Sequence, residues 1–358
     1  MKQINRGGQF AHPRVVGLDV LRVAMALLIY MFHSKMHFGC HYGILEDFVS
    51  VGAIAMTGFF LLSGYSLRLV YGEKNLMDIK EIGRFYVKRV LGILPLYYTL
   101  AIFFILFLGK ESWVDNVCLF PIEVLGLQST FTSLFGITHN GGTWFISCLL
   151  LGYLVYPFLQ TIVRQLCHKQ KIFLALLLIF VDLWATIVRI KFHTAWIYDN
   201  PFYRIIEFAI GLIVADINMT TDGNAMEILR SWWVTIGASI AMLVSVSFVN
   251  AHWGISDYML LNWIALPCFV LMMFGIGNNR LGVEKWRVLN YASKISYAFF
   301  LAQYFVWPIG WWFLDVIGYN QNWLRILFSF ILCVIIAALM YEIVQNKLVE
   351  LIRKKCNI

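Results

Sequence analysis

The chain has 358 residues, of which 60% are hydrophobic and 13% are charged, and its mean hydropathy is +0.74. This composition excludes a soluble globular domain, because such domains are roughly half apolar and about a quarter charged. The net charge of +8 does not indicate nucleic-acid binding, since Lys and Arg are concentrated in alternate loops, as in polytopic membrane proteins.

Ten apolar stretches are long enough, or nearly so, to cross about 30 Å of hydrocarbon as helices. They lie near residues 15–34, 49–70, 93–109, 143–163, 172–190, 203–218, 232–249, 258–276, 295–314 and 326–346. The period-two alternation of a membrane barrel is absent, and backbone groups in lipid require helices. The sequence therefore predicts an all-α polytopic membrane protein with ten transmembrane helices, organised as one domain over residues 1–358.

Positive charge is divided unevenly between the two predicted sides of the membrane. The even-numbered connections and both termini hold 21 of the 28 Lys and Arg residues, whereas the other side holds six. The positive-inside rule then predicts that both termini are cytoplasmic. The longest predicted loops are about 71–92 inside and about 110–142 outside. The first apolar stretch lacks a small-residue cleavage site, so we expect a retained helix rather than a signal peptide.

The first predicted helix carries Arg22 and, eleven residues later, His33. Eleven steps of about 100° are three turns plus about 20°, so both side chains lie on one face, roughly 16 Å apart along the axis. A charge there costs at least about 2.5 kcal/mol on insertion scales. A histidine at this boundary is often only an interfacial polar tip, but its alignment with Arg22 favours a general base. Alternatively, Asp19 and Arg22 form a structural ion pair.

Two later segments offer further candidates. Ser63, in GFFLLSGYSL, either allows close helix approach or faces a site. Lys88 and Arg89 precede Pro95 at the predicted cytoplasmic mouth of the third helix. They either anchor the helix to lipid headgroups or bind the phosphates of a cytoplasmic donor such as coenzyme A.

The remaining candidates lie in the fourth, sixth and ninth predicted helices. Trp144 fits an aromatic belt at the outer interface, and Ser147 is one turn deeper. Glu207 is an intramembrane acid and therefore a site candidate, although Arg204 one turn away makes a local salt bridge equally compatible. Gln303 is a polar residue within a span. The seven cysteines show no metal-ligand spacing, so we expect no metal site.

Taken in order, these segments resemble the acyltransferase-3 family of integral-membrane O-acyltransferases, which acylate sugars of cell-surface glycans. Arg22 to His33 matches the R-x10-H signature, the most specific element of the family. The segments GFFLLSGY, KRVLGILP, TWFISCLLLGYLVYP, RIIEFAIG and KISYAFFLAQ match later elements, so the resemblance covers nearly the whole chain. The chain departs from the family at three points. No second arginine follows Arg89 in the third-helix run. Leu149 and Leu150 stand where many members have acids, and Gln303 stands where many have a histidine.

The resemblance implies O-acyl transfer, most simply of acetyl, from acetyl-coenzyme A to a hydroxyl of an extracytoplasmic or lipid-linked glycan. It implies an inner-membrane location and no permanently bound cofactor. The expected partners are the donor, the glycan and membrane lipids, and nucleic acid is not among them. His33, with Arg22, would be catalytic as a base or a transient acyl carrier, and Lys88, Arg89 and Arg22 would bind the donor. Candidate oxyanion or acceptor contacts are Ser63, Trp144, Ser147, Glu207 and Gln303.

Two alternatives to a self-contained enzyme stay open. A transporter or flippase for a glycan or lipid precursor also fits intramembrane charges. Transporters often show inverted repeats, however, and no such repeat is visible in this sequence. A subunit that passes acetyl groups to a separate extracytoplasmic transferase is the third possibility.

Overall fold

The computed structural model describes residues 15–108, 112–130, 141–193, 197–278, 286–319 and 321–356. The described part is 87% helical and contains no strand. The longer helices are α1 (Val16–Phe38), α3 (Ala55–Tyr71), α4 (Ile79–Phe103), α5 (Trp113–Val124), α7 (Trp144–Gln165), α8 (His168–Phe192), α9 (Pro201–Thr220), α11 (Trp232–Trp253), α12 (Tyr258–Asn278), α13 (Arg287–Val316) and α14 (Asn322–Met340). The shorter ones are α2 (Glu46–Val49), α10 (Asn224–Leu229) and α15 (Val349–Cys356).

The all-α polytopic architecture is confirmed. Each of the ten predicted spans falls on one of these helices, and eight helices of the described part are long and apolar enough to cross a membrane. The other two predicted spans fall on α9 and α13, which are more polar. The charged residues of α9 (Arg204, Glu207 and Asp216) are all buried inside the protein. The total of ten spans and the cytoplasmic location of the termini stay predictions.

Two of the predicted loops are wrong in part, because they contain helix. The first turns of α4, which lie in the predicted loop 71–92, are capped by Asp78, whose carboxylate accepts from the backbone N–H groups of Lys80 and Glu81 at 2.9 and 3.1 Å. The predicted outer loop 110–142 contains α5, capped by Ser112. Hydropathy missed both elements, since the start of α4 is charged and α5 has only 12 residues.

The centre of the bundle is built on a close crossing of α3 and α9. A Cβ atom added at Gly64 would collide with the carbonyl oxygen of Phe208, and one added at Gly211 would collide with that of Leu61. Glycine therefore lets the two backbones touch, as small residues do between membrane helices. The close approach predicted for the Ser63-Gly64 segment is confirmed.

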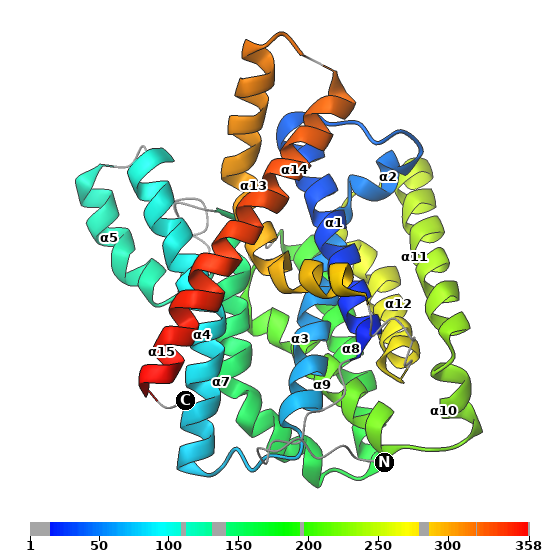
Figure 1. Cartoon of the computed structure of the whole chain (residues 1–358). Coiled ribbons are helices and arrows are strands. Elements are labelled where there is room, and N and C mark those ends of the chain that lie inside the picture. Colours follow the sequence, from blue (N-terminus) through cyan, green and yellow to red (C-terminus); the bar gives the residue numbers. More distant parts are fainter. Residues whose placement is uncertain are drawn as a thin grey trace.

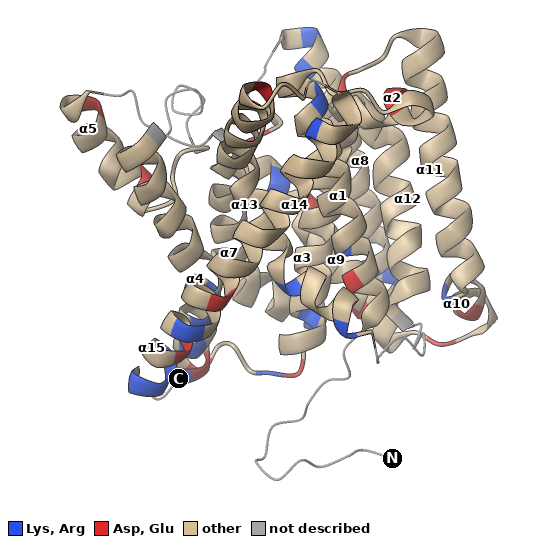
Figure 2. Cartoon of the chain, turned by 45° about the horizontal axis from the view of Figure 1, so that its top comes forward, with Lys and Arg blue, Asp and Glu red and all other residues tan. Residues whose placement is uncertain are grey.

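The other helices surround this pair. Helix α1 packs against α3 on one side and α13 on another, whereas α4 and α5 flank one side of the bundle and α11 and α12 the other (Figure 1). Lys and Arg residues of α15 and of the first turns of α4 gather at one end of the bundle (Figure 2). That end is the predicted cytoplasmic side.

Candidate functional site

Polar contacts join α1 to α13 at two places along the helices. Near the start of both helices, Arg22 Nη1 donates to Ser293 Oγ at 3.1 Å and lies 3.5 Å from Asp19 Oδ1, while Ser293 Oγ donates to the same carboxylate at 2.5 Å. Further along, His33 Nδ1 lies 3.1 Å from Gln303 Oε1. The two helices therefore run in the same direction, and α13 supplies a partner to both residues of the Arg22–His33 pair. The ion pair between Arg22 and Asp19, which the sequence analysis gave as an alternative, is also present.

His33 is buried, with 8% of its surface exposed, among aromatic rings of α13. Its ring centroid lies 6.0 Å from Phe300, 5.1 Å from Tyr304 and 6.0 Å from Trp307. An amide oxygen only accepts hydrogen bonds, so the contact with Gln303 Oε1 places the proton of a neutral imidazole on Nδ1. Nε2 of His33 is then the unprotonated nitrogen, which is the state that a general base requires.

Gln303 has a second polar group that is not used by the protein. Its side chain is fully buried, and within the described residues its Nε2 has no hydrogen-bond partner. A buried amide that lacks a partner costs about 1–3 kcal/mol. The amide thus holds His33 through its oxygen and leaves a donor beside the histidine.

A cavity of about 230 Å³ lies next to Arg22. It is lined by residues of α1, α3, α4, α7 and α13, namely Arg22, Met56, Phe59, Phe60, Ser63, Gly92, Ile93, Phe145, Leu149, Tyr153, Ser296, Tyr297 and Phe300. Among these described lining residues, Arg22 carries the only charge. Leu149, at the position where the resemblance leads one to expect an acid, adds to the apolar wall.

The cavity ends one aromatic layer below His33. Phe300 lines the cavity and contacts the His33 ring, and it packs edge-on against Phe145 with the centroids 4.6 Å apart. Ser63 also lines the cavity, with its hydroxyl donating to the Phe59 carbonyl of its own helix at 2.8 Å. Arg22 and His33 are therefore connected through one apolar space and one ring.

Lys88 and Arg89 have different surroundings in the structure. The Arg89 guanidinium lies 5.9 Å from the ring centroid of Tyr153, which lines the cavity, and donates from Nη2 to the Tyr71 hydroxyl at 3.1 Å. Lys88 forms no hydrogen bond or ion pair within the described residues. Both side chains are partly buried, so the difference between them lies in these contacts. Tyr153, which sequence reasoning missed, thus links Arg89 to the cavity that Arg22 lines.

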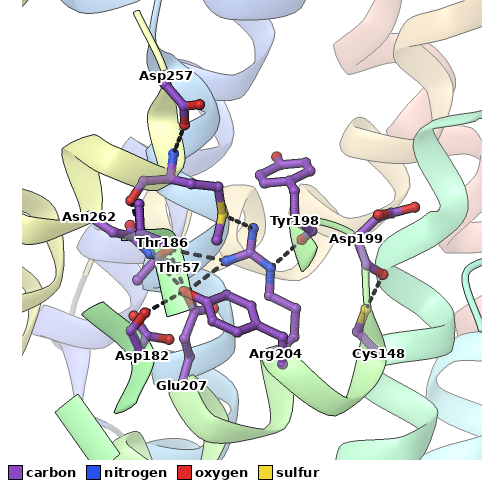
Figure 3. Close-up of polar contacts among 12 residues, drawn as sticks. Thr57, Cys148, Asp182, Thr186, Tyr198, Asp199, Arg204, Glu207, Asp257 and Asn262 are labelled. Atoms are coloured by element: carbon purple, nitrogen blue, oxygen red, sulfur yellow. Dashed lines mark hydrogen bonds and ion pairs between the residues drawn. The ribbon is translucent and has the colours of Figure 1, made fainter. Parts of the chain in front are cut away.

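Glu207 belongs to a separate buried cluster (Figure 3). Its Oε1 accepts from Arg204 Nη1 at 2.7 Å, from Thr57 Oγ1 at 2.7 Å and from Asn262 Nδ2 at 3.1 Å. Arg204 Nε donates to the Tyr198 carbonyl at 2.7 Å. Arg204 is 1% exposed and Glu207 is 0% exposed. The structure therefore contains the local salt bridge between Arg204 and Glu207 that the sequence analysis gave as an alternative.

Trp144 is one wall of an aromatic cage around Arg204. The Arg204 Cζ atom lies 5.6 Å from the ring centroid of Trp144, 4.6 Å from Tyr198 and 5.5 Å from Phe60. Trp144 is only 7% exposed, so its interpretation as an interfacial belt residue is wrong. Cation–π attraction to the buried Arg204 guanidinium holds the Trp144 ring inside the protein and not at the lipid interface. Neither Trp144 nor Glu207 lines the Arg22 cavity.

Ser147 is held by a chain segment that precedes α7. Its hydroxyl accepts a hydrogen bond from the backbone N–H of Ser129 at 3.2 Å, and both residues are buried. Ser147 is likewise not among the residues that line the Arg22 cavity. Of the five predicted oxyanion or acceptor contacts, Gln303 alone contacts His33, and Ser63 alone lines the cavity.

Comparison with known proteins gives one match. A family model described as an acyltransferase domain matches residues 15–342, from the start of α1 to the end of α14. Neither the curated proteins nor the solved structures contain a match. Within the described residues, no group of three or more His, Cys, Asp or Glu side chains is placed to hold a metal ion.

Proposed function

Because the chain belongs to the acyltransferase-3 family, we propose that it transfers an acetyl group from acetyl-coenzyme A to a hydroxyl of an extracytoplasmic or lipid-linked glycan. The match and the apolar helices make it a multi-pass membrane acyltransferase. The observation that supports the finer proposal is the continuous arrangement of Arg22, the apolar cavity and His33. We place the enzyme in the inner membrane, with the donor arriving from the cytoplasm.

The donor binds along the line from Arg89 to Arg22. The phosphates of coenzyme A meet Arg89 at the cytoplasmic end, and the pantetheine arm enters the cavity past Tyr153 and Arg22. A guanidinium offers several donors in a planar fork, so it binds phosphate and carbonyl oxygens more specifically than an ammonium does. Lys88, for which the described residues show no hydrogen bond or ion pair, attracts the donor only through its charge.

The chemistry takes place where Phe300 separates the cavity from His33. His33 Nε2 removes the proton of the acceptor hydroxyl as its oxygen attacks the thioester carbonyl carbon. The C–S bond then breaks, and the coenzyme A thiolate takes the proton from His33, so that an ester and a thiol are formed. The free Nε2 amide of Gln303 donates to the developing oxyanion.

We expect Gln303→Glu to lower kcat by about 10²- to 10³-fold, the range seen when one oxyanion donor is lost. The glutamate keeps an oxygen that accepts from His33 Nδ1 but replaces the amide donor with a second acceptor. The donor KM should stay unchanged. A glutamate variant that is as active as wild type would show that Gln303 only orients His33. Gln303→Leu, which loses both contacts, should then still be inactive.

Arg89→Ala should raise the KM for acetyl-coenzyme A by about 10- to 100-fold, as expected for losing hydrogen bonds to a charged group. Lys88→Ala, the adjacent and matched replacement of a cation, should raise it less than about fivefold. Initial rates of coenzyme A release over a range of donor concentrations measure both values. Equal effects of the two variants would contradict a specific site at Arg89 and favour general attraction of the donor.

The proposed function is tested by following the acetyl group itself. The full chain in nanodiscs is given acetyl-coenzyme A labelled in the acetyl group, together with a membrane glycan extract. We expect ester-linked label in the glycan and an equal amount of free coenzyme A. A transporter would leave the donor intact, and a subunit that only passes acetyl groups onward would label no glycan without a second protein.

A further inference from the structure

On the predicted outer side of His33 lie aromatic groups that the mechanism has not used. Tyr304 packs against His33, and its ring centroid lies 5.2 Å from His37, which is exposed one turn beyond His33 on α1. The rings of His33 and His37 are 5.8 Å apart. Any acceptor that reaches His33 along this face of α1 passes Tyr304 and His37.

Two further tyrosines continue this surface across the bundle. Tyr198, just before α9, packs edge-on against Tyr258 at the start of α12, with the ring centroids 4.5 Å apart. Burial raises the pKa of the Tyr198 phenol, the Arg204 charge opposes this rise, and the Tyr258 and Tyr304 phenols add to it. Tyr198 also packs against Trp144, with the ring centroids 4.9 Å apart, and the next residue, Phe145, packs against Phe300 beside His33. Ring contacts therefore connect groups from four segments to the surroundings of His33.

These groups offer hydrogen bonds and ring faces without charge. Tyr198, Tyr258 and Tyr304 are each partly exposed, and their hydroxyls have no hydrogen-bond partner within the described residues. A phenol donates and accepts through its hydroxyl, while its ring packs against apolar C–H surfaces. Sugar rings present the same combination of hydroxyl edges and C–H faces.

Of the five Lys and Arg residues described on the predicted outer side, four form ion pairs. In the described part, Lys35 pairs with Glu46, Arg189 with Asp257, Arg204 with Glu207 and Arg325 with Asp315, and Lys191 lies over the Phe192 ring. A carboxylate or phosphate on the acceptor would have to compete with an existing partner. Burying an anion without a cation is costly, whereas a hydroxyl needs only hydrogen bonds.

We propose that the acceptor is an uncharged sugar, held next to His33 by His37, Tyr198, Tyr258 and Tyr304. This inference rests on the proposed acyl transfer and names the substrate class that the site selects. Sugars that carry carboxylate or phosphate at the acylated residue are poor acceptors. The selection comes from ring contacts, from hydroxyls that lack a protein partner, and from the absence of an unengaged arginine at these four groups.

The test uses the charge of the labelled product. The full chain in nanodiscs is incubated with labelled acetyl-coenzyme A and source-cell membranes, and mild acid then releases the glycans from lipid carriers. After partial hydrolysis to short oligosaccharides, anion exchange separates uncharged from anionic fragments. Ester label in the uncharged fraction is the expected result. Label in the anionic fraction would overturn this inference but keep the proposed function, and label in neither fraction would overturn both.

Variants test the residues. Tyr304→Phe and Tyr198→Phe should each raise the acceptor KM about tenfold and leave the donor KM unchanged, because each loses a hydrogen bond to the sugar. Tyr319→Phe, an exposed tyrosine beyond the end of α13, is the matched control and should change neither value. His37→Lys places a cation at the same approach and should increase labelling of anionic fragments. Unchanged acceptor KM values in both tyrosine variants would contradict this placement of the acceptor.

Discussion

Replacing His33 with alanine should lower acyl transfer by about 10²- to 10⁴-fold, the usual contribution of a general base. The buried imidazole lies between the Arg22 cavity and the predicted outer side, and Gln303 leaves its Nε2 unprotonated. The rate of coenzyme A release in nanodiscs, with acceptor glycan present, measures the loss. The donor KM should be nearly unchanged, because the phosphates bind at Arg89.

The His33 variant needs a control for folding, since alanine leaves Gln303 Oε1 without its partner. This loss costs about 1–3 kcal/mol. His33→Gln restores a donor to Gln303 but supplies no base, so it should fold like wild type and be as inactive as the alanine variant. His252→Ala, which removes an exposed histidine at the end of α11, should retain full activity. Transfer retained by both His33 variants would sink the catalytic assignment.

The sequence was sufficient to predict the helices and the Arg22–His33 pair, because both depend on local periodicity. Eleven residues on one helix define a shared face whatever packs against it. The contact of Gln303 with His33 joins residues 270 positions apart, so no local pattern reveals it. A polar residue within an apolar span was the available signal, and it identified Gln303 as a candidate without its partner.

Other site residues were beyond sequence reasoning for the same physical reason. Tyr153 is one tyrosine among 17, and only the packing of α4 against α7 brings it between Arg89 and the cavity. Trp144 was misplaced because a tryptophan at a helix start looks the same in a lipid interface as in a cation cage. The partner that decides between them, Arg204, is 60 positions away in sequence.

Replacing Arg204 with methionine should destabilise the protein by about 3–5 kcal/mol, the cost of breaking a buried ion pair from one side. Glu207 would stay fully buried with only the Thr57 and Asn262 donors to stabilise its charge. Those partners lie on α3 and α12, so the cluster also fixes α9 against α12 and against α3, which carries part of the cavity wall. Thermal unfolding in detergent, followed by tryptophan fluorescence, measures the loss.

Two further variants separate charge from packing. Adding Glu207→Gln to Arg204→Met removes the stranded charge and should recover part of the stability, because the amide still accepts from Thr57. Arg325→Met is the matched surface control, since Arg325 also combines an acid, Asp315, with an aromatic ring, Trp311 at 4.3 Å. That pair is partly exposed through Asp315 and should be worth less than about 1 kcal/mol. Equal losses at Arg204 and Arg325 would mean that burial does not make the Arg204 cluster special.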